Sequence, residues 1–336
     1  MIYYYQVEGQ VRNNIGDVLQ GMAAKAFLPQ GALVADREAL SEMNSTEQGL
    51  FIANGWYMHS FEKFPPPGNI KPVYVSVHVA NSQLLTSKKV RDHFKLHSPI
   101  GCRDTKTLKL FLGWGIPAYY SSCLTITTKP KLEQGHPKNE EIILVDNVDH
   151  PVPEDVISKL EKSYGKTFTR ISHDPPVVDV DFKEYAESSE KHMESLLKRY
   201  CAATLVVTTK IHCALPCLGM GANVLFIHPQ PDDPRLATIA EFIDIVSYKD
   251  ILEKESISSS PVNQDKLNQR RKFLVDLVSQ SVQKGYNVIT RPGSDEYKSI
   301  RLKSMLSAKL VRGMVLIARK VGFKKEQMDR VYGSEI

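Results

Sequence analysis

The sequence predicts an α/β fold of two doubly wound, Rossmann-like domains that face each other across a cleft. Strand-like apolar runs alternate with helix-like amphipathic runs almost throughout, which is typical of parallel sheets covered by helices. The 336 residues suffice for two domains of roughly 100 to 200 residues each. A polar stretch without periodicity, at 127–140, separates two halves of this alternation. We therefore expect an N-terminal α/β domain over 1–130, a C-terminal α/β domain over 131–285 and a basic helical tail over 286–336.

The first half of the chain begins with the pattern of a strand, a loop and a helix. The strand "YYYQV" is followed by "DVLQGMAAKAF", whose apolar residues fall on one helical face with Asp17 as the candidate N-cap. "LFIA" predicts a strand that ends at the turn pair Asn54-Gly55, and "VYVSVHV" (73–79) predicts another. "SPIGCRD" then passes into the predicted helix "TKTLKLFLGWG".

The second half repeats the alternation. "EIILVD" predicts a strand, and the next helix is expected to begin at Pro153 and to end near Gly165. A long amphipathic helix is predicted over about 182–200. "TLVVTT" has the apolar character of a strand buried on both faces, and the helix that follows it begins near His212.

The net charge of +5 is concentrated in the tail. Residues 286–336 carry 11 Lys or Arg and 5 Asp or Glu, so residues 1–285 have a net charge of −1. A nucleic-acid-binding protein would present a basic face on the folded body, and we therefore expect no nucleic-acid partner. The tail has one apolar stripe with Lys and Arg beside it. Packing across the domains is the favoured interpretation, and peripheral contact with an anionic membrane is the alternative.

The amino terminus and the cysteines indicate a soluble, cytoplasmic protein, located at the cytoplasmic face of the membrane if the tail contacts lipid. "MIYYYQVEGQ" lacks the basic start and apolar segment of a signal peptide, and no stretch reaches the ~18 apolar residues that span a bilayer. The five cysteines form no CxxC pair, which favours reduced, buried thiols. Cys213 and Cys217 could hold a metal with His212, but further ligands are missing nearby, so we expect none.

Polar residues follow three predicted strands, where loops lead into helix N-termini. They are "RNNIGD" (12–17), "GCRD" (101–104) and "TTKIH" (208–212). In open parallel sheets, ligands bind beyond the carboxyl ends of the strands, and helix N-termini favour anions. We therefore expect these three stretches to form a ligand site.

The corner "TTKIH" carries Lys210 and His212. The residues after it are small, so the next helix can pack closely on the sheet, and its N-terminus favours an anion beside these two side chains. On spacing alone, a simpler interpretation is favoured, in which His212 caps the helix and Lys210 is a solvated lysine.

In "GCRD", Arg103 lies at the end of a strand, and Asp104 or Thr105 caps the next helix. An arginine can grip a carboxylate or a phosphate through two parallel hydrogen bonds. A surface ion pair that contributes little to stability is an equal alternative.

Four residues of the first half are candidates for contacting a second ligand. Asn14 offers an amide, and Asp17 offers a carboxylate, although an N-cap role is favoured for Asp17. Their stretch lacks the GxGxxG and GxxxxGK[ST] spacings of dinucleotide folds and P-loops. Trp56, expected after a turn, can stack on a sugar or lie in the core. His78 lies inside a predicted strand, where a structural role is favoured, and a contact with the second ligand is the alternative.

Three regions together resemble the polysaccharide pyruvyl transferase family. They are "NNIGDVLQGMAAKAF", "PIGCRDTKTLKLFLGWGIPAYYSSCLTIT" and "ATLVVTTKIHCALPCLGMGANVLFIH", in the family's order and at similar spacing. The resemblance implies a fold of the GT-B glycosyltransferase type, with phosphoenolpyruvate as the donor between the domains. The N-terminal domain would form the acceptor side and the C-terminal domain the donor side.

The resemblance also implies a reaction. Members transfer the enolpyruvyl unit of phosphoenolpyruvate to a hexose or N-acetylhexosamine, usually closing a cyclic ketal, during assembly of capsule, exopolysaccharide or cell-wall glycans. No metal or other cofactor is normally required. The acceptor sugar is free, nucleotide-linked or lipid-linked, and the sequence leaves these three cases open.

The resemblance assigns roles to the candidate residues. His212 matches the histidine proposed as acid/base, which suits a group whose pKa lies near the working pH. Arg103 and Lys210 would hold the anionic groups of the donor. The family usually has arginine at the position of Lys210, and lysine keeps the charge but loses the bidentate geometry. The candidates on the acceptor side are Asn14, Asp17, Trp56 and His78.

Two other functions are compatible with the sequence. A glycosyltransferase of the same fold would need a diphosphate site for a nucleotide-sugar donor, with Arg235 as a candidate contact, although the start of a surface helix is the favoured interpretation of Arg235. A non-catalytic scaffold of a glycan-assembly complex would keep its biological activity after His212→Ala. Charged residues at three strand ends argue against the scaffold.

Overall fold

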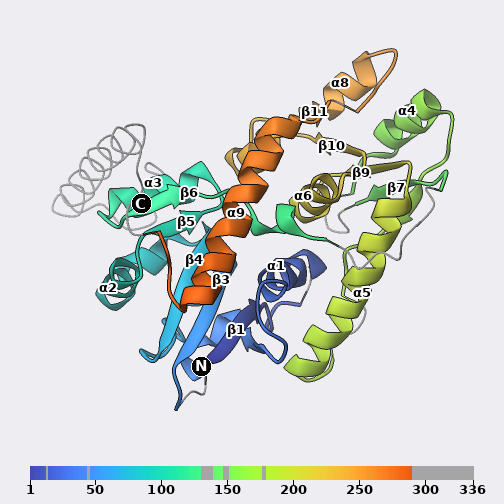
Figure 1. Cartoon of the computed structure of the whole chain (residues 1–336). Coiled ribbons are helices and arrows are strands. Elements are labelled where there is room, and N and C mark those ends of the chain that lie inside the picture. The colour runs from blue at the N-terminus through green and yellow to red at the C-terminus, as the bar shows by residue number, and fades with distance from the viewer. Residues whose placement is uncertain are drawn as a thin grey trace.

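The computed structural model describes residues 1–12, 14–43, 46–129, 139–146, 151–175, 179–259 and 261–289, and these form two α/β units (Figure 1). The first unit contains a six-stranded sheet and the second a five-stranded sheet. Neighbouring strands run parallel in both sheets. The prediction of a mixed α/β protein with two parallel sheets is therefore confirmed. The boundaries at 130 and 285 stay predictions.

The strand order of the first sheet is β2-β1-β3-β4-β5-β6. The chain adds strands on one side of β1 and then on the other, so the switch point lies between β1 and β3. Ligand sites of such sheets form outside the carboxyl ends of the strands at this switch point. The strands are β1 (Ile2–Val7), β2 (Leu33–Asp36), β3 (Gly49–Tyr57), β4 (Ile70–Val79), β5 (Ile100–Cys102) and β6 (Ala118–Tyr120). The helices of this unit are α1 (Ile15–Lys25), η1 (Arg37–Glu42), η2 (Ser82–Thr86), α2 (Lys88–Leu96), α3 (Thr105–Gly113) and η3 (Leu124–Thr127).

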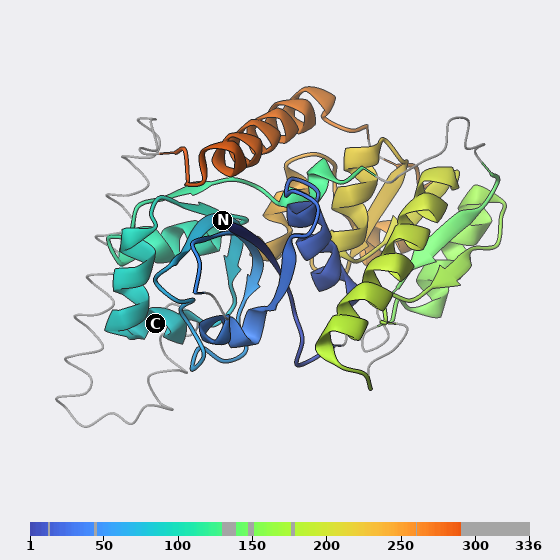
Figure 2. The same cartoon turned by 60° about the horizontal axis from the view of Figure 1, so that its bottom comes forward.

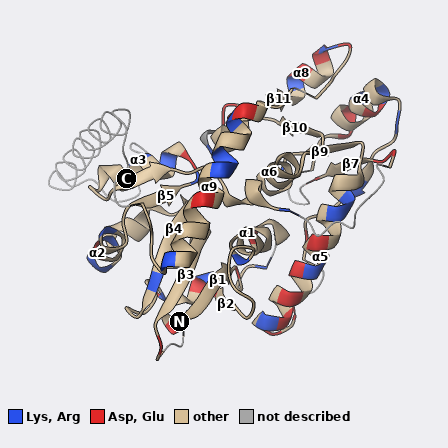
Figure 3. Ribbon diagram, viewed as in Figure 1, with Lys and Arg blue, Asp and Glu red and all other residues tan. Residues whose placement is uncertain are grey.

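The second sheet has the order β11-β10-β9-β7-β8, with its switch point between β7 and β9. Its strands are β7 (Ile142–Val145), β8 (Thr169–Ile171), β9 (Leu205–Thr208), β10 (Val224–His228) and β11 (Val246–Ser247). The helices are α4 (Glu154–Tyr164), α5 (Phe182–Ala202), α6 (Ile211–Met220), η4 (Pro234–Leu236), α7 (Ala237–Ala240), α8 (Tyr248–Glu253) and α9 (Gln264–Lys284). Charges of both signs follow one another along α5, as its amphipathic sequence predicts (Figure 3). Within the described residues, no helix is both long and apolar enough to cross a bilayer.

One buried apolar cluster runs through both units. It includes Ile15 of α1, Ile126 of η3, Leu215 of α6 and Leu274 of α9. Helix α1 lies between the first sheet and helices α5 and α6 of the second unit (Figure 2). Two further apolar clusters pack against the other face of each sheet. Because the units share a core, the predicted cleft is closed where α1 meets α6.

Helix α9 crosses from the second unit back over the first (Figure 1, orange). The ring of Phe273 meets the ring of Tyr119 edge-on, with 6.0 Å between centroids. The Arg270 guanidinium lies 4.8 Å from the ring centroid of Tyr120. Residues that the sequence assigned to the C-terminal domain thus cover the end strand of the first sheet. The predicted helical tail lies outside the described residues from residue 290 onward.

The predicted turn at Asn54-Gly55 is wrong, because β3 continues through it. Pairing with β4 shifts register between Ala53 and Gly55, and Gly55 adopts a φ of 96°, which a glycine tolerates. The Asn54 side-chain amide donates to the backbone carbonyl of Gln20 on α1 at 2.7 Å. This bulge is held in place by α1, and Trp56 therefore lies inside the strand.

The N-cap of α1 is Asn14, and the prediction of Asp17 is wrong. The side-chain oxygen of Asn14 accepts a hydrogen bond from the backbone amide of Gly16 at 3.0 Å. Asp17 lies in the first turn, where the helix dipole favours a carboxylate.

The close packing of α6 on η3 gives a stability prediction. A Cβ at Gly219 would collide with the backbone carbonyl of Ile126. We expect Gly219→Ala to lower the free energy of unfolding by about 1–3 kcal/mol, measured by urea denaturation. Gly68→Ala is the matched control, because a Cβ there meets no atom within 4 Å, and it should stay within about 0.5 kcal/mol of the wild type. Equal midpoints for the two variants would contradict this packing.

Candidate functional site

The corner between β9 and α6 places Lys210 and His212 at the interface of the two units. The Thr208 hydroxyl donates to the backbone carbonyl of Val145 at 3.0 Å and accepts from the backbone amide of Lys210 at 3.0 Å. Helix α6 begins at Ile211, so Lys210 is the N-cap residue, without a hydrogen bond from its side chain to the helix. His212 lies in the first turn. The interpretation of His212 as a helix cap is therefore wrong.

Arg103 reaches from the first unit to His212. Its backbone amide donates to the carbonyl of Val77 at 2.8 Å, which fixes the residue beside β4. Its side chain donates through Nη1 to Nε2 of His212 at 3.1 Å and to Oε1 of Gln20 at 3.3 Å. Arg103 is only 6% exposed, so the alternative of a surface ion pair is wrong. The structure thus brings together the two main site residues that the sequence predicts.

His212 is neutral in this arrangement. Burial lowers the pKa of His212 well below its usual range, and the charges of Arg103, His173, His78 and Lys210 lower it further. Because Arg103 donates to Nε2, we infer that this nitrogen carries no proton and that Nδ1 does. An anion bound beside these groups would have the opposite effect and favour the charged imidazolium.

The N-terminus of α1 packs against the same histidine. A Cβ at Gly16 would lie 2.9 Å from Cβ of His212, so this close approach requires glycine. The backbone amide of Ile15 donates to the carbonyl of His173 in the second unit at 2.9 Å. Asn14 lies at this junction, but its side-chain oxygen is used as the helix cap. The N-termini of α1 and α6 therefore meet at His212, and both favour an anion.

His78 lies on β4, beside the strand end that carries Arg103. It pairs in register with Trp56 on β3. Its Nδ1 is 2.6 Å from Oδ2 of Asp104, the N-cap of α3, which also accepts from the backbone amide of Thr107 at 2.8 Å. Burial lowers the pKa of His78, the hydrogen bond to Asp104 opposes this effect, and the charge of Arg103 adds to it.

Gln20 connects Arg103 to a polar cluster at the carboxyl ends of β1, β2 and β3. Its side-chain amide donates to Oδ1 of Asp17 at 2.6 Å. That oxygen lies 3.8 Å from Nη1 of Arg37, whose guanidinium is 5.2 Å from the ring centroid of Trp56. The candidates Asp17 and Trp56 therefore belong to one cluster that begins at the Arg103–His212 contact.

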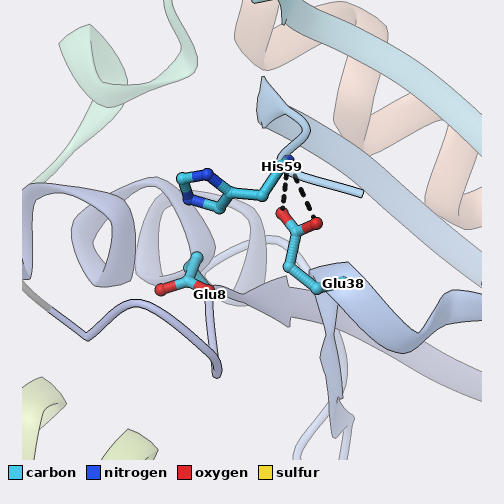
Figure 4. A group of neighbouring side chains, drawn as sticks. All are labelled: Glu8, Glu38 and His59. Atoms are coloured by element: carbon cyan, nitrogen blue, oxygen red, sulfur yellow. Dashed lines mark hydrogen bonds between the residues drawn. The ribbon is translucent and has the colours of Figure 1, made fainter. Parts of the chain in front are cut away.

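A group of metal-binding residue types lies at the edge of this cluster. The side chains of Glu8, Glu38 and His59 each place a ligand atom within 4.8 Å of the others (Figure 4). Glu8 accepts hydrogen bonds from the backbone amides of residues 10–12 at 2.7–3.0 Å. Glu38 accepts from those of His59 and Ser60 at 3.0–3.3 Å. The carboxylate oxygens of Glu8 and Glu38 thus accept hydrogen bonds from backbone amides of the loops. This arrangement holds the loops in place and fits that role better than the binding of a cation.

The sequence interpretation missed His173 and Arg37. His173 is 1% exposed, and its Nε2 lies 2.8 Å from the hydroxyl of Tyr200. It follows β8, so the strand-end rule that identified Arg103 could have found it. Arg37 begins η1 directly after β2 and is 2% exposed. The same rule applies to it.

Arg235 is held in a surface ion pair. Its Nη2 lies 2.6 Å from Oδ2 of Asp233, and its backbone amide donates to Oδ1 of the same residue at 2.8 Å. The Arg235 side chain is 64% exposed. This geometry agrees with the start of a surface helix.

The two α/β units meet at a corner where Arg103 of the first unit lies beside His212 and Lys210 of the second. The chain belongs to the polysaccharide pyruvyl transferase family, whose model matches residues 14–230 and so includes Arg103, Lys210 and His212. No curated protein matches the chain. Among solved structures, it is similar to the wall teichoic acid polymerase TagF, with 9% sequence identity and a TM-score of 0.35. That match covers 94% of this chain and 89% of the other.

The hydrogen bond from Arg103 gives a prediction about His212. We expect Arg103→Ala to raise the pKa of His212, because the substitution removes a neighbouring positive charge and the donor that occupies Nε2. The measurement is an NMR titration of the imidazole. Arg103→Lys, which keeps the charge, should raise the pKa less. A pKa that stays constant or falls in Arg103→Ala would show that the contact does not control this histidine.

Proposed function

We propose that this protein transfers the enolpyruvyl group of phosphoenolpyruvate to a sugar, closing a ketal, in polysaccharide or cell-surface glycan biosynthesis. The contact between Arg103 and His212 across the two units is the observation that carries the proposal. The donor would lie between the units, in a GT-B-like arrangement, and no cofactor is needed. The acceptor sugar would be free, nucleotide-linked or lipid-linked. The reaction would take place in the cytoplasm or at the cytoplasmic face of the membrane.

The charges of the corner suit this donor. Phosphoenolpyruvate carries a carboxylate and a phosphate on one small enol, and it therefore needs several cations or amide dipoles close together. The guanidinium of Arg103, the side chain of Lys210 and the N-termini of α1 and α6 converge at this corner. In the proposed complex, the donor accepts the hydrogen bond from Arg103 that His212 now accepts.

His212 would supply the proton that starts the reaction. A proton moves from the imidazolium to the methylene carbon of the donor, a sugar hydroxyl forms a bond to the adjacent carbon, and the bond from that carbon to the phosphate oxygen breaks. A second hydroxyl then closes the ketal. The two hydroxyls release two protons, of which one restores His212 and one leaves with the phosphate, so the protons balance.

Donor binding would also charge His212. Without a ligand, the pKa of His212 lies well below its usual range, and the group is neutral. The anions of the donor stabilise the imidazolium and raise the pKa, so binding takes up a proton. By linkage, the affinity for the donor must then rise as the pH falls.

Variants of the two contacting residues test the proposal. We expect Arg103→Ala to weaken binding of phosphoenolpyruvate by about 10- to 100-fold, since it removes a charged hydrogen bond. His212→Gln should keep most of the binding but lower transfer by about 10²- to 10⁴-fold, because it removes the acid. Thermal-shift titration and phosphate release are the measurements.

If uridine or guanosine diphosphate stabilises the protein and phosphoenolpyruvate does not, the protein is a nucleotide-sugar glycosyltransferase. Unchanged glycan assembly by His212→Gln in cells would favour a scaffold.

The pH dependence of binding provides a separate test. Between pH 8 and 6, the affinity of the wild type for phosphoenolpyruvate should rise more than that of His212→Gln. The variant corrects for titration of the donor itself, because both proteins meet the same ligand. Isothermal titration calorimetry in two buffers of different ionisation enthalpy should also show a greater proton uptake in the wild type than in His212→Gln. Parallel pH profiles would remove His212 from the donor site.

A further inference from the structure

We propose that His78 is a second catalytic residue, which takes the proton from the attacking sugar hydroxyl, and that Asp104 positions it. This inference rests on the proposed pyruvyl transfer. It gives the two histidines different tasks, with His212 as the acid toward the donor and His78 as the base toward the acceptor.

The surroundings of Asp104 hold His78 in a fixed orientation. Asp104 accepts from the backbone amide of Thr107 at 2.8 Å and from its hydroxyl at 3.1 Å. The same hydroxyl accepts from the backbone amide of Val79 at 3.0 Å, which ties the start of α3 to β4. The carboxylate of Asp104 is thus held in place, and its Oδ2 accepts a hydrogen bond from Nδ1 of His78 at 2.6 Å. The Nε2 nitrogen therefore carries the lone pair that can accept a proton.

In the proposed reaction, Nε2 of His78 meets the hydroxyl of the acceptor. Among the residues that the structure describes, it accepts or donates no hydrogen bond, and 8% of the side chain is exposed. A histidine that is locked on one nitrogen and open on the other is the arrangement of a general base with its orienting carboxylate.

The position of His78 in the sheet places it between the two halves of the site. Tyr57, Val77 and Val79 belong to the apolar cluster on the outer face of the sheet. Side chains alternate along a strand, so Trp56 and His78, which pair in register, face the opposite side, where α1 packs. On this side, the Arg103–His212 contact is the donor end, and the Trp56 cluster is the other end.

The lining at the far end suits a polyhydroxyl ligand. The Arg37 guanidinium lies over the indole of Trp56, 5.2 Å from the ring centroid, and the ring centroids of Trp56 and His59 are 4.3 Å apart. The half-buried indole would offer its remaining apolar surface to a sugar. Nη2 of Arg37 is buried and has no hydrogen-bond partner among the described residues. The carboxylate of Asp17 adds an acceptor for hydroxyl groups. A sugar on Trp56 would therefore present its hydroxyls toward His78.

The charge state of His78 suits a base. The groups that face it are Asp104, Arg103, Lys106 and His212, and the balance of burial and charge lowers the pKa of His78. The imidazole is therefore neutral near pH 7 and able to accept a proton. Asp104 would then stabilise the imidazolium that forms.

The addition step needs a proton donor and a proton acceptor at the same time, and two histidines can supply both. One imidazole cannot be protonated toward the methylene and unprotonated toward the hydroxyl in the same addition step. In the proposed reaction, His212 gives its proton to the methylene while His78 takes the hydroxyl proton. His78 passes this proton to the departing phosphate, and the second hydroxyl returns a proton to His212. Each group thus ends in its starting state.

His78→Gln is the test variant, because the glutamine amide can still donate to Asp104 but cannot accept a proton. We expect unchanged affinity for phosphoenolpyruvate within about threefold, and transfer lower by about 10²- to 10⁴-fold. The pH profile of transfer should lose its decline toward low pH, and added imidazole should partly restore transfer by His78→Ala. His93→Gln is the matched control, since His93 is a half-buried histidine whose Nε2 lies 2.8 Å from the hydroxyl of Tyr74, a residue of the outer cluster. It should retain the wild-type pH profile.

The acceptor probes are p-nitrophenyl glycosides of hexoses and N-acetylhexosamines. The same sugars linked to nucleoside diphosphate and to polyprenyl diphosphate test the other two kinds of acceptor. Products are detected by mass spectrometry. Two results would overturn the role of His78 alone. One is a transfer rate of His78→Gln within threefold of the wild type. The other is a transfer rate of this variant that still declines toward low pH as in the wild type. A loss of transfer that only matches a loss of donor affinity would do the same. A wild type that neither binds phosphoenolpyruvate nor modifies any probe would overturn the proposed function together with this inference.

Discussion

The hydrogen bond from Arg103 to Nε2 of His212 is the contact on which the rest of the site depends. It joins a strand end of the first sheet to a helix start of the second, 109 positions apart in the chain. Such a contact forms only if the helices between the sheets approach closely, and the sequence provides for this with glycine. Gly16 allows α1 to touch His212, and Gly219 allows α6 to touch the backbone of η3. The site is therefore a product of the interface between the units, and a change in their relative position changes its chemistry.

The electrostatics of the interface support the proposal of a small polyanion as the donor. Four charged or titratable groups lie close enough to act on His212, namely Arg103, His173, His78 and Lys210. Burial makes several neighbouring cations costly, and it lowers the pKa values of both His78 and His212, so these two histidines are neutral. A ligand with two anionic groups reverses this cost and allows protons to enter the site. Binding and protonation are thus linked, and the acid needed for the proposed reaction would exist only when the donor is present.

Much of this organisation is predictable from the sequence, because strand ends and helix starts are local features. The alternation of apolar runs identified both sheets, and the rule that ligands bind beyond parallel strands selected Arg103, Lys210 and His212. Contacts between distant segments are less accessible to such rules. The bulge at Gly55 depends on the bond between Asn54 and α1, which no local pattern reveals. The capping role of Asn14 was missed because Asp17 is an equally good cap by residue type. The return of α9 over the first sheet likewise depends on tertiary packing.

The different side-chain geometries of Arg103 and Lys210 suggest an orientation for the proposed donor. Arginine has a planar fork that matches a carboxylate or a phosphate, whereas lysine is a point charge. Arg103 is buried and held by Gln20, so its fork has a fixed direction, while Lys210 lies at the N-terminus of α6 beside backbone amides. A phosphate accepts bonds from many directions and tolerates a point charge combined with amide dipoles. The carboxylate would then lie on Arg103 and the phosphate at Lys210, which places the methylene carbon beside His212. On this argument, a lysine at position 210 preserves the chemistry, because the directional part of donor recognition comes from the first unit.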